Sequence, residues 1–136
     1  MAFANAALPV VADSETADDT EELENGVLAT FTVSGEVFKV WVTNPGTIQQ
    51  LFDLAEGSAK ATIPNGRIHR GPGWAAHNQP WSWHLDPEDL QMAEVTIEVC
   101  DARPSYVEEN LDYFVNSVGR YCPWGAVLVN LEDFRD

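Results

Sequence analysis

The chain of 136 residues has the length of one ordinary domain, and with 45% hydrophobic residues it is large enough to bury a single core. Its formal net charge of −15 argues against binding to nucleic acid or to anionic membrane surfaces, because both require a cluster of basic side chains that the sequence lacks. No apolar run approaches the roughly 18 residues that would indicate a membrane-spanning helix.

The first 26 residues contain seven acidic residues and no basic one, and they show no amphipathic period. This composition is typical of a solvated tail, so we predict a disordered acidic tail over residues 1–26 and a single domain over residues 27–136. Ala2-Phe3-Ala4 resembles the small-x-small end of a secretory signal peptide. A signal remnant would make the protein secreted or periplasmic, and an ordinary alanine-rich start is the alternative.

The first part of the domain predicts a β-hairpin followed by a helix. Leu28–Val33 and Glu36–Thr43 alternate apolar and polar residues, with a turn between them. Asn44-Pro45 then combines a capping side chain with a proline suited to the first helical position, and apolar residues recur at helical spacing up to Ala55. We expect a short amphipathic helix that ends near Gly57.

The middle of the chain predicts three further strands. Ala61–Arg70 forms one of them, interrupted or bent at Pro64-Asn65-Gly66, and Trp81–Leu85 forms a shorter one. Met92–Cys100 has the clearest pattern of a central strand, and its alternating apolar residues share one face. These apolar residues are Val95, Ile97 and Val99.

The last part of the chain predicts a helix and a strand. Ser105 and Glu108 form a capping box at the start of the helix, and Gly119 ends it. Trp124–Leu131 alternates again and predicts the last strand. The whole order indicates an α+β fold, a mostly antiparallel sheet with two helices packed on it, and we expect Trp41 and Trp124 in its core.

Cys100 and Cys122 are the two cysteines of the chain. A pair is compatible with one disulfide or with two buried thiols, and an oxidising compartment favours the disulfide. Closing the loop between them would stabilise the fold by about 3 kcal/mol on the chain-entropy model. They are too few for a zinc knuckle.

Residues 63–87 hold all three histidines, three of the five tryptophans and four of the eight prolines. Proline removes a backbone donor and fixes φ, so we expect this stretch to be largely loop. A stiff loop that offers indole, imidazole and guanidinium groups is suited to recognise a protein partner. The predicted contact residues are Asn65, Arg67, Arg70, Trp74, His77, Trp81 and Trp83, with Trp74 the most exposed and at least one of Trp81 and Trp83 in the core.

Ser82, His84 and Asp86 share one face of the short strand, in the order of a nucleophile, a base and an orienting acid. Neighbours on one strand face lie about 6 to 7 Å apart, which is too far for a hydrogen-bonded relay. We therefore predict no catalytic residue and a non-enzymatic binding domain.

Two specific functions follow from the same segment. A protease inhibitor would present Arg67 or Arg70 to a trypsin-like pocket. The alternative is a module that binds a divalent cation, Zn²⁺ or Ca²⁺, through His84 and Asp86. The sequence has no known metal-ligand spacing, and the two side chains could instead donate to a carbonyl and cap a turn.

Four motifs in this order resemble a family of small exported bacterial domains that are often labelled calmodulin-binding-protein-like. They are Pro80–Pro87, Ile97–Asp101, Tyr106–Glu109 with Leu111, and Cys122–Gly125, within a match of roughly residues 30–129. The resemblance implies a signal-bearing precursor and a bridge between Cys100 and Cys122. It implies no catalytic residues.

Overall fold

The computed structural model describes residues 23–57 and 62–135, so most of the predicted tail lies outside the described residues. Asn25 and Gly26, which the prediction placed in the tail, form backbone hydrogen bonds of 3.1 and 2.9 Å with Phe134. These two residues therefore belong to the folded domain, which begins slightly earlier than we predicted.

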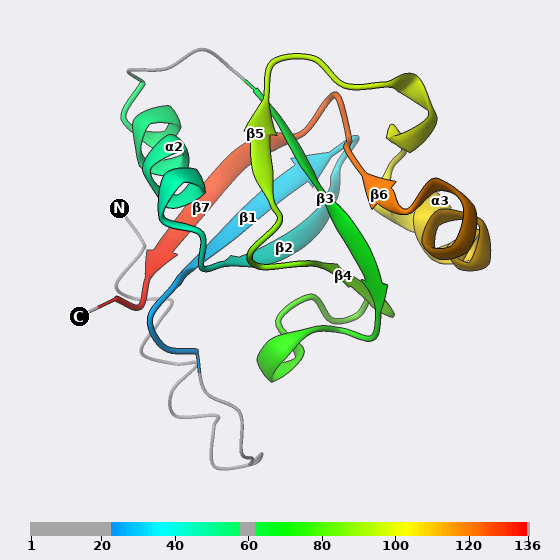
Figure 1. The fold of residues 1–136 in the computed structure, drawn as a ribbon, viewed down its shortest axis with the longest axis horizontal. Coiled ribbons are helices and arrows are strands. Elements are labelled where there is room, and N and C mark those ends of the chain that lie inside the picture. Colours follow the sequence, from blue (N-terminus) through cyan, green and yellow to red (C-terminus); the bar gives the residue numbers. More distant parts are fainter. Residues whose placement is uncertain (1–22, 58–61, 136) are drawn as a thin grey trace.

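The first sheet has three antiparallel strands in the order β2-β1-β7 (Figure 1). Its strands are β1 (Val27–Val33), β2 (Glu36–Val42) and β7 (Val127–Asp133). The predicted hairpin and the predicted last strand are thus confirmed. Phe31 lies opposite Phe38 on the inner face of the hairpin, and their rings stack with centroids 5.4 Å apart.

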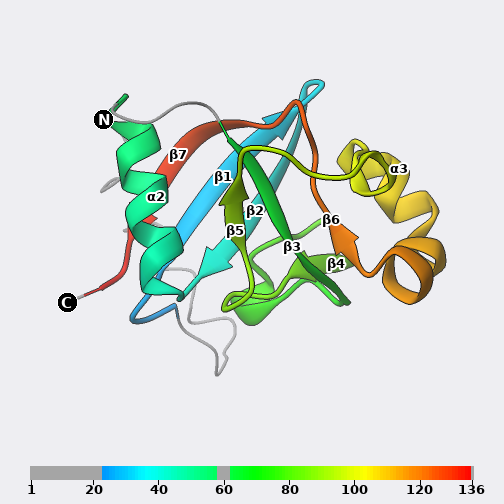
Figure 2. The same cartoon turned by 45° about the horizontal axis from the view of Figure 1, so that its top comes forward.

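The second sheet is built around β3 (Ile63–Arg70), which pairs antiparallel with three short strands. These are β4 (Trp83–Leu85), β5 (Gln91–Ala93) and β6 (Arg120–Tyr121). β3 crosses over the first sheet in both views (Figures 1 and 2). The core lies between the sheets, because the Phe38 ring also contacts the rings of Trp83 and Tyr121, at 5.9 and 5.4 Å.

β3 runs without a break through Pro64-Asn65-Gly66, so the predicted interruption is wrong. The strand changes partner there, from β5 at Asn65 to β6 at Gly66. Glycine suits this crossing because a Cβ at position 66 would lie 3.2 Å from Leu90 Cδ1. The glycine therefore serves close packing and not a turn.

Helix α2 (Pro45–Ala55) begins as predicted: the Asn44 side chain accepts hydrogen bonds from the amides of Gly46 and Thr47. It lies beside β7 and β5, while α3 (Pro104–Glu109) lies against β2 at the opposite side of the sheets (Figure 2). After α3 the chain forms a π-helical turn (Tyr113–Val118) that ends, as expected, at Gly119. Two 3₁₀ turns, Trp74–Ala76 and Glu98–Cys100, complete the elements of the described residues, and the α+β class is confirmed.

The predicted central strand Met92–Cys100 is wrong beyond Ala93. β3 begins at Ile63, which pairs with Ala93, so the rest of the segment has no described strand to pair with. Its alternating apolar residues are exposed to solvent, and Val95 is 81% exposed. The segment instead ends in the 3₁₀ turn Glu98–Cys100, so the alternation of apolar residues predicted neither the strand nor its partner.

The predicted capping box is also wrong. Arg103 is the N-cap of α3, and Ser105 donates from its amide and its hydroxyl to the carboxylate of Glu36 on β2, both at 2.8 Å. Glu108 instead accepts a hydrogen bond from the amide of Ser82. Both carboxylates therefore connect distant segments and not neighbouring positions of one helix.

Cys100 and Cys122 form a disulfide with Cα atoms 5.1 Å apart. Of the two alternatives left open by the sequence, the disulfide is therefore confirmed and the pair of buried thiols is wrong. Trp41 is buried as predicted, whereas Trp124 is 42% exposed and does not belong to the core. Within the described ranges, no helix is both long and apolar enough to cross a membrane.

Candidate functional site

The predicted recognition segment divides into strand and loop. Asn65, Arg67 and Arg70 lie on β3, and Trp83 lies on β4, opposite Arg70. Residues 71–82 form the connection between these two strands, and we call this connection the Trp74 loop. The strands predicted at the two ends of residues 63–87 are confirmed, and the expected loop is confined mainly to residues 71–82 between them.

Two of the predicted contact residues are buried. Trp83 is 0% exposed and packs among Phe38 and Tyr121, and His77 is 7% exposed. Neither side chain can reach a partner in this conformation, so their assignment as contact residues is corrected. Trp81 is partly buried, and its Nε1 donates to the Val37 carbonyl at 2.7 Å.

The two arginines do not project from a loop. The amide of Arg67 donates to Asp89 Oδ2, and its carbonyl accepts from the amide of Asp86. The Arg70 guanidinium forms an ion pair with Asp112. An inhibitor loop needs an extended backbone that a protease can pair with, and the Arg67 backbone is already paired within the fold.

The three histidines come together where the Trp74 loop, which contains His77, meets β3 and β4. The His84 ring lies 5.4 Å from the His69 ring and 6.0 Å from the His77 ring, between centroids. His84 Nδ1 donates to the Gly71 carbonyl, and His77 Nδ1 donates to the Trp74 carbonyl, both at 2.8 Å. Two imidazoles thus hold the backbone of the loop, and burial lowers the pKa of His77 to about 4.

Asp86 is a turn cap as well as a partner of histidine. One of its carboxylate oxygens accepts from the amide of Glu88 at 2.9 Å, and the other lies 3.1 Å from His69 Nε2. Partial burial by itself would raise the pKa of Asp86, but these hydrogen bonds outweigh it and lower the pKa.

The predicted metal ligands have separate structural roles. His84 bonds to the Gly71 carbonyl, whereas Asp86 bonds to His69 and to its own turn. Across the part of the chain that the structure describes, no three histidine, cysteine, aspartate or glutamate side chains are placed to hold a metal ion. The geometry gives the divalent-cation hypothesis no support.

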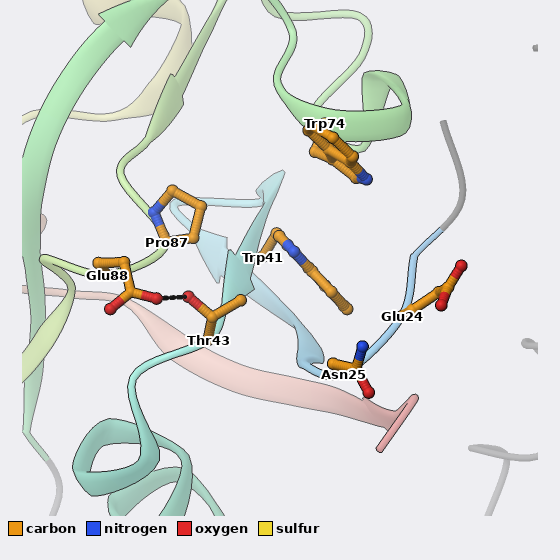
Figure 3. A pocket seen from close by; sticks show the side chains of 7 residues that line it. All are labelled: Glu24, Asn25, Trp41, Thr43, Trp74, Pro87 and Glu88. Carbon is orange, nitrogen blue, oxygen red and sulfur yellow. Dashed lines mark hydrogen bonds between the residues drawn. The ribbon is translucent and has the colours of Figure 1, made fainter. Parts of the chain in front are cut away.

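A groove of about 410 Å³ lies beside the Trp74 loop and provides the best candidate site (Figure 3). Its walls come from four separate segments: the Trp74 loop, the end of β2, the β4–β5 connection and the residues just before β1. Trp74 is 50% exposed, as its flanking residues predicted. The lining residues are Glu24, Asn25, Trp41, Thr43, Trp74, Pro87 and Glu88.

The walls of the groove are held by contacts within the fold. Thr43 donates from its hydroxyl to Glu88 Oε2 and from its amide to the Pro87 carbonyl. The Trp41 ring lies so close to Gly26 that a Cβ there would be 2.6 Å from the ring, and Phe134 packs edge-on against the same ring. Figure 3 shows both indoles bordering the same open space.

Sequence reasoning identified only Trp74 among the groove residues. Trp41 was assigned to the core, and Asp86 was considered as a turn cap, and both assignments are correct as local structure. No local pattern could have united the groove residues, because four distant segments meet only in the folded domain.

Comparison with known protein families gives a match over nearly all of the described chain. A family model described as the BP-74 N-terminal domain matches residues 24–135. No curated protein and no solved structure matches the chain.

Proposed function

The chain belongs to the BP-74 N-terminal domain family, and we propose that it is an exported, non-enzymatic domain that binds a protein partner through the Trp74 loop and the adjoining groove. The observation that carries this proposal is Trp74 itself, a half-exposed indole that borders the same groove as the buried Trp41. Tryptophan is among the residues that contribute most to binding at protein interfaces.

The attachment of the Trp74 loop supports the proposal. Asn78 accepts from the amide of Lys39 and donates to the Trp83 carbonyl, both at 2.8 Å. Trp81 and Ser82 are tied to β2 and α3 in the same way. A loop held at this many points loses little conformational entropy on binding, so more of the contact energy remains as affinity.

Export is supported by the disulfide between Cys100 and Cys122, since cytosolic thiols are kept reduced. A non-enzymatic role is supported by the partners of His84 and Asp86. The imidazole of His84 bonds to a carbonyl and Asp86 bonds to His69, so the two do not form a relay with Ser82.

The test compares two exposed tryptophans. Trp74→Ala removes the indole of the Trp74 loop, and Trp124→Ala removes a similarly exposed indole from the connection between β6 and β7. Figures 1 and 2 show that connection well away from the one between β3 and β4. Immobilised wild-type domain and both variants are used to capture proteins from the native culture fluid. The affinity of each captured protein is then measured after purification.

We expect Trp74→Ala to weaken binding at least tenfold and Trp124→Ala to leave it unchanged, with the same melting temperature for both variants. If the two variants bind equally well, or if the wild-type domain captures no protein, the proposal is wrong.

A further inference from the structure

We infer that the groove beside the Trp74 loop binds an arginine side chain of the partner. This inference rests on the proposed function, because it names the chemistry by which the partner is recognised. Its basis is the combination of two indoles with two carboxylates around one open space (Figure 3).

The indoles favour a cation. Trp41 and Trp74 border the groove, and tryptophan has the aromatic face that attracts cations most strongly. Trp74 is 50% exposed and supplies the accessible aromatic face, whereas Trp41 is 4% exposed and forms a fixed part of the wall, held in place by Gly26 and Phe134.

The charges around the groove favour a positively charged ligand. Glu24 and Glu88 are its charged residues, and none of the described residues that line it is basic. The net charge of −15 adds a long-range attraction for basic partners. The same charges repel phosphate groups, which argues against a nucleic acid or an anionic lipid in this groove.

The chemistry of the groove lining favours arginine over lysine. A guanidinium group is planar, stacks on aromatic faces and is less strongly hydrated than an ammonium group. Its several donors can also reach a carboxylate, and Glu88 uses one oxygen for Thr43, so its second oxygen can accept. The volume of about 410 Å³ leaves room for one long side chain.

The test uses acetyl-arginine amide and its neutral analogue, acetyl-citrulline amide, as probes. Each is titrated into the full chain while the indole N–H signals are followed by NMR. We expect arginine to shift the signals of Trp41 and Trp74 with an affinity at least fivefold higher than that of citrulline, and lysine amide to bind more weakly than arginine. Equal affinity for arginine and citrulline, or tighter binding of lysine, would overturn the inference.

A second experiment uses variants in which glutamate is replaced by uncharged glutamine. Glu24→Gln and Glu88→Gln remove one negative charge each, and a glutamine at position 88 can still accept from Thr43. Glu109→Gln removes an exposed charge from α3 and serves as the matched control. We expect the double variant to lose the preference for arginine and the control to keep it; a preference unchanged in the double variant contradicts the inference.

The failure of this inference can be told apart from failure of the proposed function. If Trp74→Ala abolishes partner capture while arginine does not bind the groove, the Trp74 loop binds its partner by other contacts. If arginine binds but Trp74→Ala leaves capture unchanged, the loop is not the interface.

Discussion

The His77 imidazole illustrates how one buried residue makes the Trp74 loop sensitive to pH. Its Nδ1 donates to the Trp74 carbonyl, and its Nε2 is buried without a hydrogen-bond partner among the described residues. His84 and Lys39 face it and add to the lowering of its pKa, which burial dominates. A proton added at Nε2 would therefore be a buried, unpaired charge beneath the loop.

We predict that His77 makes the domain less stable as the pH falls. The pKa of His77 is about 4 in the folded protein and 6.5 when unperturbed, so between these values the unfolded chain takes up a proton that the folded chain does not. Stability should be fully present above about pH 6.5 and should decline by about 2 to 3 kcal/mol on approaching pH 4.

Urea unfolding of wild type and His77→Asn across this range tests the prediction, since asparagine retains a donor for the Trp74 carbonyl. The variant should show the shallower loss of stability on acidification. His69→Asn, which changes a more exposed imidazole, serves as the control, and identical pH slopes for wild type and His77→Asn would refute the prediction.

At the scale of elements, Glu36 joins the β-hairpin to α3. Its carboxylate accepts from the amide and the hydroxyl of Ser105, and the hydrogen bond from that amide is the main reason for its lowered pKa. In effect a side chain from β2 caps the first turn of a helix that is 69 residues away in the sequence. The cap therefore also fixes the position of α3 against the sheet.

We predict that Glu36→Ala lowers the free energy of unfolding by about 1 kcal/mol, the usual cost of losing a helix cap. Glu36→Gln should lose less, because its carbonyl oxygen can still accept one of the two hydrogen bonds. Chemical denaturation measures both, with Glu109→Ala as a control on the same helix. A Glu36→Ala variant as stable as the control would show that the cap contributes nothing.

For the whole molecule, the disulfide ties the segment after β5 to the end of β6. Cys122 donates from its amide to the Cys100 carbonyl at 2.8 Å, so the bridge is reinforced by the backbone. It closes a loop that contains α3 and the π-helical turn. Both helical segments are short, and most of their stability must come from such tertiary connections.

We predict that replacing both cysteines by alanine lowers stability by about 3 kcal/mol, because the unfolded chain gains the freedom of a loop with a sequence separation of 22 residues. The melting temperature of the double variant, compared with that of wild type with and without reductant, checks this. Reduced wild type should behave like the variant. An unchanged melting temperature in both would show that the bridge does not stabilise the fold.

Local sequence determined those elements whose start, end or pairing depends on residues only a few positions apart. The hairpin, the Asn44 cap, the proline start of α2 and the glycine end at Gly119 were all predictable, because each depends on backbone preferences or on a neighbouring side chain. The exposed position of Trp74 belongs to the same group, since glycine and proline surround it. The fold class followed from the order of these elements.

Tertiary structure decided which segments pair and which side chains meet. Residues 94–100 have the alternation of a strand and yet leave the sheet, because β3 offers no pairing beyond Ile63. The carboxylates of Glu36 and Glu108 find donors that are distant in the sequence, and the groove unites four segments. The pattern of apolar residues and the backbone preferences of each residue act over a few positions. Strand pairing, burial and the assembly of a site depend instead on contacts that only the folded chain creates.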